Sequence, residues 1–113
     1  MPSRPLRRSP ARARGGPRPA YRRVLLKLTG QAFASPSAGG IDLDQVDSLA
    51  RVIADCWRRK VDLALVVGGG NLFKGTQAAV HGMNRAVADY VGMLATCINA
   101  LCLQEAVERL GVE

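Results

Sequence analysis

The feature that most constrains the fold of this chain is an apolar run that ends in three consecutive glycines. Residues 61–67 are apolar apart from one aspartate, and the sequence Gly-Gly-Gly-Asn follows directly at positions 68–71. A short, almost uninterrupted apolar run is typical of a parallel strand that is covered on both faces. Glycines directly after such a strand let backbone N–H groups approach a phosphate without a Cβ in the way. The alternative is a tight turn with a purely structural role.

Further segments complete an alternating pattern around this strand. Residues 24–28 form an earlier apolar run that ends at Thr29-Gly30, which predicts another buried strand and its turn. Between the two runs, Asp42 can cap a helix with a single apolar stripe. A long helix is predicted over residues 84–110, with Gly111 as its stop. The stripe of the first helix recurs at spacings of three and four residues: Leu43, Val46, Ala50, Ile53 and Trp57.

The order strand, helix, strand, helix predicts an α/β fold with a largely parallel sheet. Two strands are too few for a stable open sheet of this kind. The long helix is apolar on more than one face, as in a helix packed inside a larger body. We therefore expect residues 21–113 to be the N-terminal part of a domain whose C-terminal portion lies outside this sequence.

Positive charge is concentrated at the N-terminus. The formal net charge is +7, but residues 1–20 hold six arginines and no acid, which leaves ten basic and nine acidic residues in the rest. We predict a disordered Arg/Pro-rich extension over residues 1–20, because this segment has almost nothing apolar to bury. An RNA-binding protein acting through the extension is an alternative, although interleaved aromatic residues and a recognisable RNA-binding module are missing.

The cysteines and the apolar segments bear on location. Three cysteines at irregular spacing do not suit a disulfide framework and indicate a reducing compartment. The longest apolar stretch, residues 90–103, is interrupted by Gly92, Thr96 and Asn99, and it falls short of the roughly 18 apolar residues of a membrane span. We expect a cytoplasmic protein with no membrane partner and no specific nucleic-acid partner.

Two lysines lie where an open parallel sheet places its ligands, beyond the carboxyl ends of the strands. Lys27 is the penultimate residue of the first apolar run, where a charge is costly to bury without an anionic partner. Lys74 follows the glycine turn and can supply a further cation. The alternative for Lys27 is a side chain that reaches solvent from the strand end.

Asp89 is an acidic residue in the first turns of the long helix, in a segment with few other charges. Its carboxylate can accept hydrogen bonds from the hydroxyls of a ribose. Alternatively, it only places a favourable negative charge near the helix N-terminus. His81 is the one histidine and has no cysteine or acidic partner at metal-binding spacing, so no metal site is predicted.

Three segments carry a recognisable pattern: residues 21–30 (YRRVLLKLTG), 65–75 (LVVGGGNLFKG) and 82–100 (GMNRAVADYVGMLATCINA). Together they resemble the opening of bacterial-type UMP kinases of the amino-acid-kinase family. The Gly-Gly-Gly-Asn element is shared loosely with aspartate, glutamate and carbamate kinases, whereas the third segment narrows the similarity to UMP kinases. The resemblance covers residues 21–113 and implies the three-layer α/β sandwich of the amino-acid-kinase fold, of which this sequence is the N-terminal half.

The resemblance also implies a reaction and an assembly. The γ-phosphoryl group of ATP would pass to UMP, with Mg²⁺, as a step of pyrimidine biosynthesis in a cytoplasmic homohexamer. Lys27 would be the catalytic cation that stabilises the transferring phosphoryl group. Gly69 and Asp89 would bind UMP. The residues on the ATP side would be Lys27, Leu28, Thr29, Gly30, Gly70 and Lys74.

Some positions depart from the family pattern. Thr29 and Gln31 replace the more usual Ser and Glu, and Lys74 replaces a more usual Arg. The family's C-terminal half supplies the adenine pocket, further UMP contacts and an acidic catalytic residue, so we expect the 113-residue chain alone to be inactive. The alternatives are a non-catalytic nucleotide-binding remnant, or a related kinase acting on a carboxylate or carbamate, against which the segment around Asp89 argues.

Overall fold

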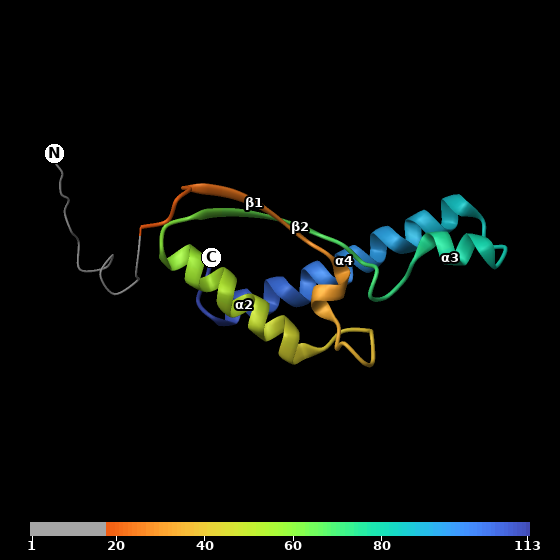
Figure 1. Ribbon diagram of the computed structural model, residues 1–113, viewed down its shortest axis with the longest axis horizontal. Coiled ribbons are helices and arrows are strands. Elements are labelled where there is room, and N and C mark those ends of the chain that lie inside the picture. The colour runs from red at the N-terminus through yellow and green to blue at the C-terminus, as the bar shows by residue number, and fades with distance from the viewer. Residues whose placement is uncertain (1–17) are drawn as a thin grey trace.

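The computed structural model describes residues 18–113, so the predicted extension over residues 1–20 falls almost wholly outside it. The two strands pair in parallel, with Arg23 opposite Asp62 and Leu28 opposite Val67, and both end at the same end of the sheet. The predicted α/β class with a parallel sheet is confirmed. The elements follow in the order β1 (Arg23–Leu28), 3₁₀ helix η1 (Gly30–Phe33), α2 (Leu43–Arg58), β2 (Asp62–Val67), α3 (Gly75–Val80) and α4 (Arg85–Arg109), as Figure 1 shows.

Both long helices begin where their sequences predict, and α4 also ends there. The Asp42 carboxylate caps α2 by accepting a hydrogen bond from the backbone N–H of Asp44 at 2.9 Å. Asn84 caps α4 by accepting from the N–H groups of Ala86 and Val87. After α4, Gly111 adopts a φ of 86°, the left-handed conformation that glycine allows at a helix end.

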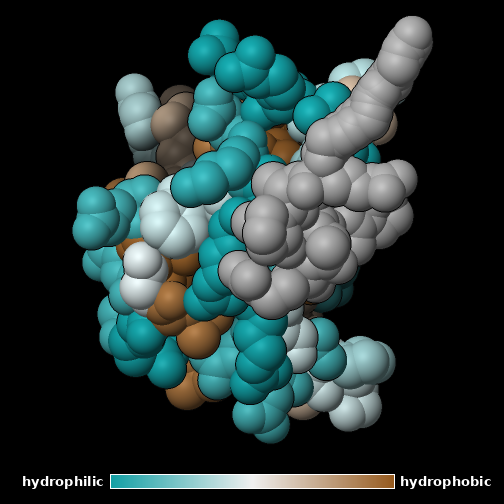
Figure 2. All heavy atoms as spheres, turned by 90° about the vertical axis from the view of Figure 1, so that its left-hand side faces the viewer, coloured by the Kyte–Doolittle hydropathy of each residue, from teal (hydrophilic) through white to brown (hydrophobic). Residues whose placement is uncertain are grey.

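The amino ends of the two strands lie near the molecular surface, whereas their carboxyl ends lead into further structural elements. At the amino ends of the strands the surface is mostly hydrophilic, with hydrophobic residues visible between the polar ones (Figure 2). At the carboxyl ends, the chain turns into η1 and into the segment that leads to α3, and α3 and the first turns of α4 extend beyond the sheet (Figure 1). Functional residues in parallel α/β folds gather at the carboxyl ends.

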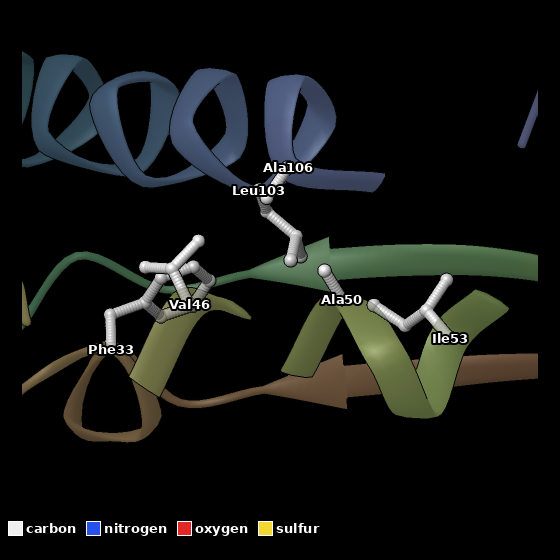
Figure 3. Close-up of a cluster of buried hydrophobic side chains, with 6 residues drawn as sticks. All are labelled: Phe33, Val46, Ala50, Ile53, Leu103 and Ala106. Carbon is white, nitrogen blue, oxygen red and sulfur yellow. The ribbon is translucent and has the colours of Figure 1, made fainter. Parts of the chain in front are cut away.

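Both long helices lie on the same side of the sheet (Figure 1). Leu63, Leu65 and Val67 of β2 pack against the core that the helices build. Of the predicted stripe of α2, three residues are buried, whereas Leu43 and Trp57 at its two ends are exposed. Figure 3 shows the buried cluster, which comprises Phe33, Val46, Ala50, Ile53, Leu103 and Ala106.

The other face of the sheet is open in the part of the chain that the structure describes. Leu25 is 69% exposed and Val66 is 45% exposed, and Lys27 lies on the same face. The sequence expectation that β2 is covered on both faces is therefore not met by residues 18–113 alone. These residues supply the sheet and one of its helix layers.

α4 passes a test for a membrane span by length and composition, with a mean hydropathy of 1.6 over 18 residues. The expectation that no stretch reaches this length is wrong by that criterion. The core helix of a layered protein passes the same test, because it too is apolar on more than one face. α4 contacts both α2 and β2 and buries Leu103 and Ala106 in the core cluster, which is the arrangement of a covering helix in an α/β domain.

Candidate functional site

The turns that follow β1 and β2 contact each other. The backbone N–H of Gly68 donates to the carbonyl of Leu28 at 2.8 Å, which extends the strand pairing into the turns. A Cβ placed on Gly30 would lie 2.5 Å from the backbone nitrogen of Gly70 and 2.6 Å from Oδ1 of Asn71. Such contacts do not occur between real atoms, so this close approach requires a glycine at position 30. The two turns therefore form one site.

Gly69 and Gly70 are glycines for different reasons. A Cβ on Gly69 would lie 2.9 Å from the Cβ of Ala95 and from the backbone nitrogen of Thr96, so the turn packs directly on α4. A Cβ on Gly70 would meet nothing closer than Cε of Lys74 at 3.7 Å, and the φ of Gly70 is not positive. Within residues 18–113, neither a steric clash nor a positive φ requires a glycine at position 70. A glycine at this position leaves the backbone open to the close approach of a ligand.

The glycine turn also presents hydrogen-bond donors. The N–H groups of Leu72 and Phe73 donate to the carbonyl of Gly69 at 3.0 and 3.2 Å. By contrast, the N–H groups of Gly69, Gly70 and Asn71 donate to no backbone carbonyl within residues 18–113. A half-buried turn whose successive N–H groups have no backbone acceptor suits an anion such as a phosphate.

The two predicted lysines lie at this end of the sheet in different settings. Lys27 is exposed on the open face of β1, opposite Val66, so the burial cost that drew attention to it is absent from the described residues. Lys74 is exposed at the start of α3, with its aliphatic chain beside Gly70. The hydroxyl of Thr29 accepts a hydrogen bond from the N–H of Gln31 at 3.4 Å and caps η1.

Asp89 lies beside the start of α3, the helix that follows the glycine turn. Its Oδ1 would be 3.5 Å from a Cβ on Gly75, the first residue of α3, and α3 packs against α4 at this point. The same oxygen accepts a hydrogen bond from Nε of Arg85 at 3.1 Å, in a pair where Asp89 is 50% exposed. Neither α3 nor η1 was predicted from the sequence. α3 connects the glycine turn to the start of α4. Its first residue, Gly75, directly follows Lys74 and lies beside Asp89.

Asn99 is a residue of this site that sequence reasoning missed. It is fully buried on α4 and hydrogen-bonds to Gly68 and Asn71. In the sequence it only interrupts the apolar stretch of residues 90–103. A signal was present, because an amide at a core position of a helix must find hydrogen-bond partners.

The described residues do not build a metal site of their own. Within residues 18–113 there is no group of three or more His, Cys, Asp or Glu side chains that could hold a metal ion. Mg²⁺ prefers carboxylate, phosphate and water oxygens. Among residues 18–113, Asp89 is the one carboxylate that we assign to this site. The donor set of the site therefore does not fit a resident Mg²⁺.

The fold and the site define an α/β protein with a glycine turn at the carboxyl ends of its parallel strands. The model of the amino acid kinase family matches residues 22–113, and the chain belongs to this family. The chain is similar to the crystal structures of UMP kinase from Ureaplasma parvum and of UMP kinase from Bacillus anthracis. Both are 32% identical in sequence, with TM-scores of 0.73 and 0.70 over 82% and 79% of this chain. The chain spans 41% and 36% of the length of those two structures.

Proposed function

We propose that this chain supplies the nucleotide-phosphate-binding half of a UMP kinase, which transfers the γ-phosphoryl group of ATP to UMP. The observation that carries the proposal is Gly70, where neither a steric clash with residues 18–113 nor a positive φ requires a glycine, beside N–H groups that have no backbone acceptor among the same residues. The similarity to two solved UMP kinases supports the choice of UMP as acceptor over a carboxylate or carbamate.

In this proposal the two joined turns position phosphates from both substrates. The N–H of Gly69 faces the UMP phosphate, whereas Gly30 and Gly70 lie on the ATP side with Leu28 and Thr29. Phosphoryl transfer depends mainly on alignment and on stabilising the charge of the transferring group. Fixed backbone dipoles supply such stabilisation without reorganising during the reaction.

The charged residues have distinct proposed roles. Lys27, exposed at the end of β1, is the cation that neutralises charge on the transferring phosphoryl group, and Lys74 beside Gly70 is a further cation for the ATP phosphates. Asp89 accepts hydrogen bonds from the UMP ribose through the oxygen that Arg85 does not occupy. Mg²⁺ would accompany the ATP phosphates, and none of these roles depends on a metal held by this chain.

Calorimetric titration of the 113-residue chain tests the proposal. We expect saturable binding of UMP and of ATP, and no binding of aspartate, glutamate or carbamate. We assign turnover to a complete protein, because the chain spans less than half the length of the two solved UMP kinases. A coupled assay of ADP release should therefore stay at the blank rate. Binding of an amino acid or carbamate in place of UMP would contradict the proposed substrate.

A further inference from the structure

Two asparagine side chains connect α4 to the glycine turn. Nδ2 of Asn99 donates to the carbonyl of Gly68 at 2.9 Å and to Oδ1 of Asn71 at 2.7 Å. Nδ2 of Asn71 donates to the carbonyl of Gly40 at 2.8 Å and to Oδ1 of Asn99 at 3.2 Å. An amide side chain carries two N–H donors. Both donors of both side chains are therefore engaged, and the pair spans three separate segments of the chain.

The surroundings of Asn99 are otherwise apolar. Its exposed fraction is 0%, and its neighbours one helical turn away on the same face, Ala95 and Leu103, are 4% and 2% exposed. An apolar side chain of similar volume would fill this position without needing partners, whereas a buried amide must be hydrogen-bonded to offset its lost hydration. The partners of Asn99 are all in the glycine turn, so this amide specifies where the turn lies on α4.

The bond to the Gly68 carbonyl has a directional consequence. The carbonyl of Gly68 and the N–H of Gly69 belong to one planar trans peptide, in which the two groups point in opposite directions. Because Asn99 holds the carbonyl toward α4, the N–H of Gly69 points away from α4. Gly69 also packs on Ala95, one helical turn before Asn99, so α4 supports the turn at two successive positions.

We propose that Asn99 is a positioning residue of the phosphate-binding turn, because it fixes the direction of the Gly69 N–H. Through Asn71, it also holds the loop that contains Gly40 against this turn. This inference rests on the proposed function, because it assigns the fixed N–H to the UMP phosphate. Asn99 itself is fully buried and acts only through Gly68 and Asn71.

The test compares UMP affinity, measured by calorimetry, in the full chain and two variants. Asn99→Leu keeps the number of side-chain heavy atoms and the branching at Cγ but removes the amide, and we expect it to weaken UMP binding at least tenfold. Leu103→Val is the matched control, because it disturbs packing on the same face of α4 one turn further on and leaves both amides intact. We expect the control to stay within about twofold of the parent, as substitutions outside the network should. Circular dichroism establishes that each variant is folded.

A third variant gives a signature that a purely structural role would not produce. In Asn99→Asp the ionised carboxylate has no donor for Gly68, whereas the protonated form has one O–H. Burial raises the pKa of a carboxyl group, so the protonated form should appear well above pH 4. We expect UMP affinity of Asn99→Asp, relative to the parent at each pH, to recover as the pH falls from about 8 to about 5.5. The ratio for Asn99→Leu should stay flat.

The outcomes separate the two claims. If the parent chain binds neither UMP nor ATP, the proposed function fails and this inference fails with it. If the parent binds UMP and Asn99→Leu binds it within twofold as well, only the positioning role is overturned. Should Asn99→Leu not fold, Asn71→Ala decides in its place. A tenfold loss of UMP affinity in that folded variant supports the network, and an unchanged affinity overturns it.

Discussion

The side-chain amides of Asn71 and Asn99 form a reciprocal pair, in which each donates to the oxygen of the other, at 3.2 and 2.7 Å. Asn71 belongs to the turn after β2, and Asn99 lies 28 residues further on, in the middle of α4. The geometry of the glycine turn is therefore not a property of its four residues alone. It also depends on the middle of α4, where Asn99 is a buried amide between the apolar residues Ala95 and Leu103.

The contact between the two turns should be visible in stability. Gly30→Ala should lower the free energy of unfolding by about 1–3 kcal/mol, the usual cost of overpacking, because the new methyl meets the backbone of Gly70. Gly92→Ala is the control, since nothing lies within 4 Å of its Cβ position in α4. That change should stabilise the helix by about 0.5–1 kcal/mol. Urea denaturation followed by circular dichroism measures both, and an unaltered stability for Gly30→Ala would mean that the turns are not in contact.

Lys27 should affect nucleotide binding more than stability. Lys27→Met replaces an exposed side chain, so the free energy of unfolding should change by no more than about 0.5 kcal/mol. ATP affinity should fall at least tenfold, which corresponds to about 1.4 kcal/mol. Arg23→Met removes a cation from the same face of β1, at the far end of the strand, and should leave ATP affinity unchanged. Equal losses in the two variants would indicate a general charge effect in place of a specific contact.

Asp89→Asn separates a ribose contact from a helix-start charge. If the carboxylate binds the UMP ribose, losing its charge should cost about 1.5–3 kcal/mol of binding, roughly tenfold to a hundredfold in UMP affinity. ATP affinity should barely change. Arg85→Gln is the control, because it breaks the exposed pair with Asp89 and keeps the acceptor, at a cost of about 0.3–0.5 kcal/mol in stability. A lowered melting temperature of Asp89→Asn with unchanged UMP affinity would mean that Asp89 only stabilises the start of α4 and does not bind the ribose.

The strands and the long helices could be predicted because their apolar residues follow a regular period. The predicted helix over 84–110 matches α4 together with its caps Asn84 and Leu110, and the predicted strands match β1 and β2 to within a residue. The short elements η1 and α3 have four and six residues, too few to show a period. Their N-cap residues, Thr29 and Lys74, were assigned to the ATP side by the resemblance to UMP kinases, and Lys74 also by its charge.

The sequence predicts a site residue only where the residue type itself indicates a role, without knowledge of its neighbours in space. Gly69 and Gly70 are indistinguishable in the sequence, and only their surroundings show that the first is needed for packing on Ala95 and the second is not. Asn99 was overlooked because its partners, Gly68 and Asn71, are distant in the chain. Lys27 was selected for a burial that residues 18–113 do not provide. Long-range contacts decide all three cases.

The most direct test of a phosphate-binding turn is Gly70→Ala. The structure has room for the methyl group, with Cε of the flexible Lys74 side chain as its nearest neighbour at 3.7 Å, so the urea midpoint should match that of the parent. The methyl would occupy the space through which a phosphate reaches the N–H groups of the turn, and ATP affinity measured by calorimetry should fall at least tenfold, or about 1.4 kcal/mol. Unchanged stability with weakened ATP binding is the predicted result. Unchanged stability with unchanged ATP and UMP affinity would contradict a nucleotide-phosphate site at this turn.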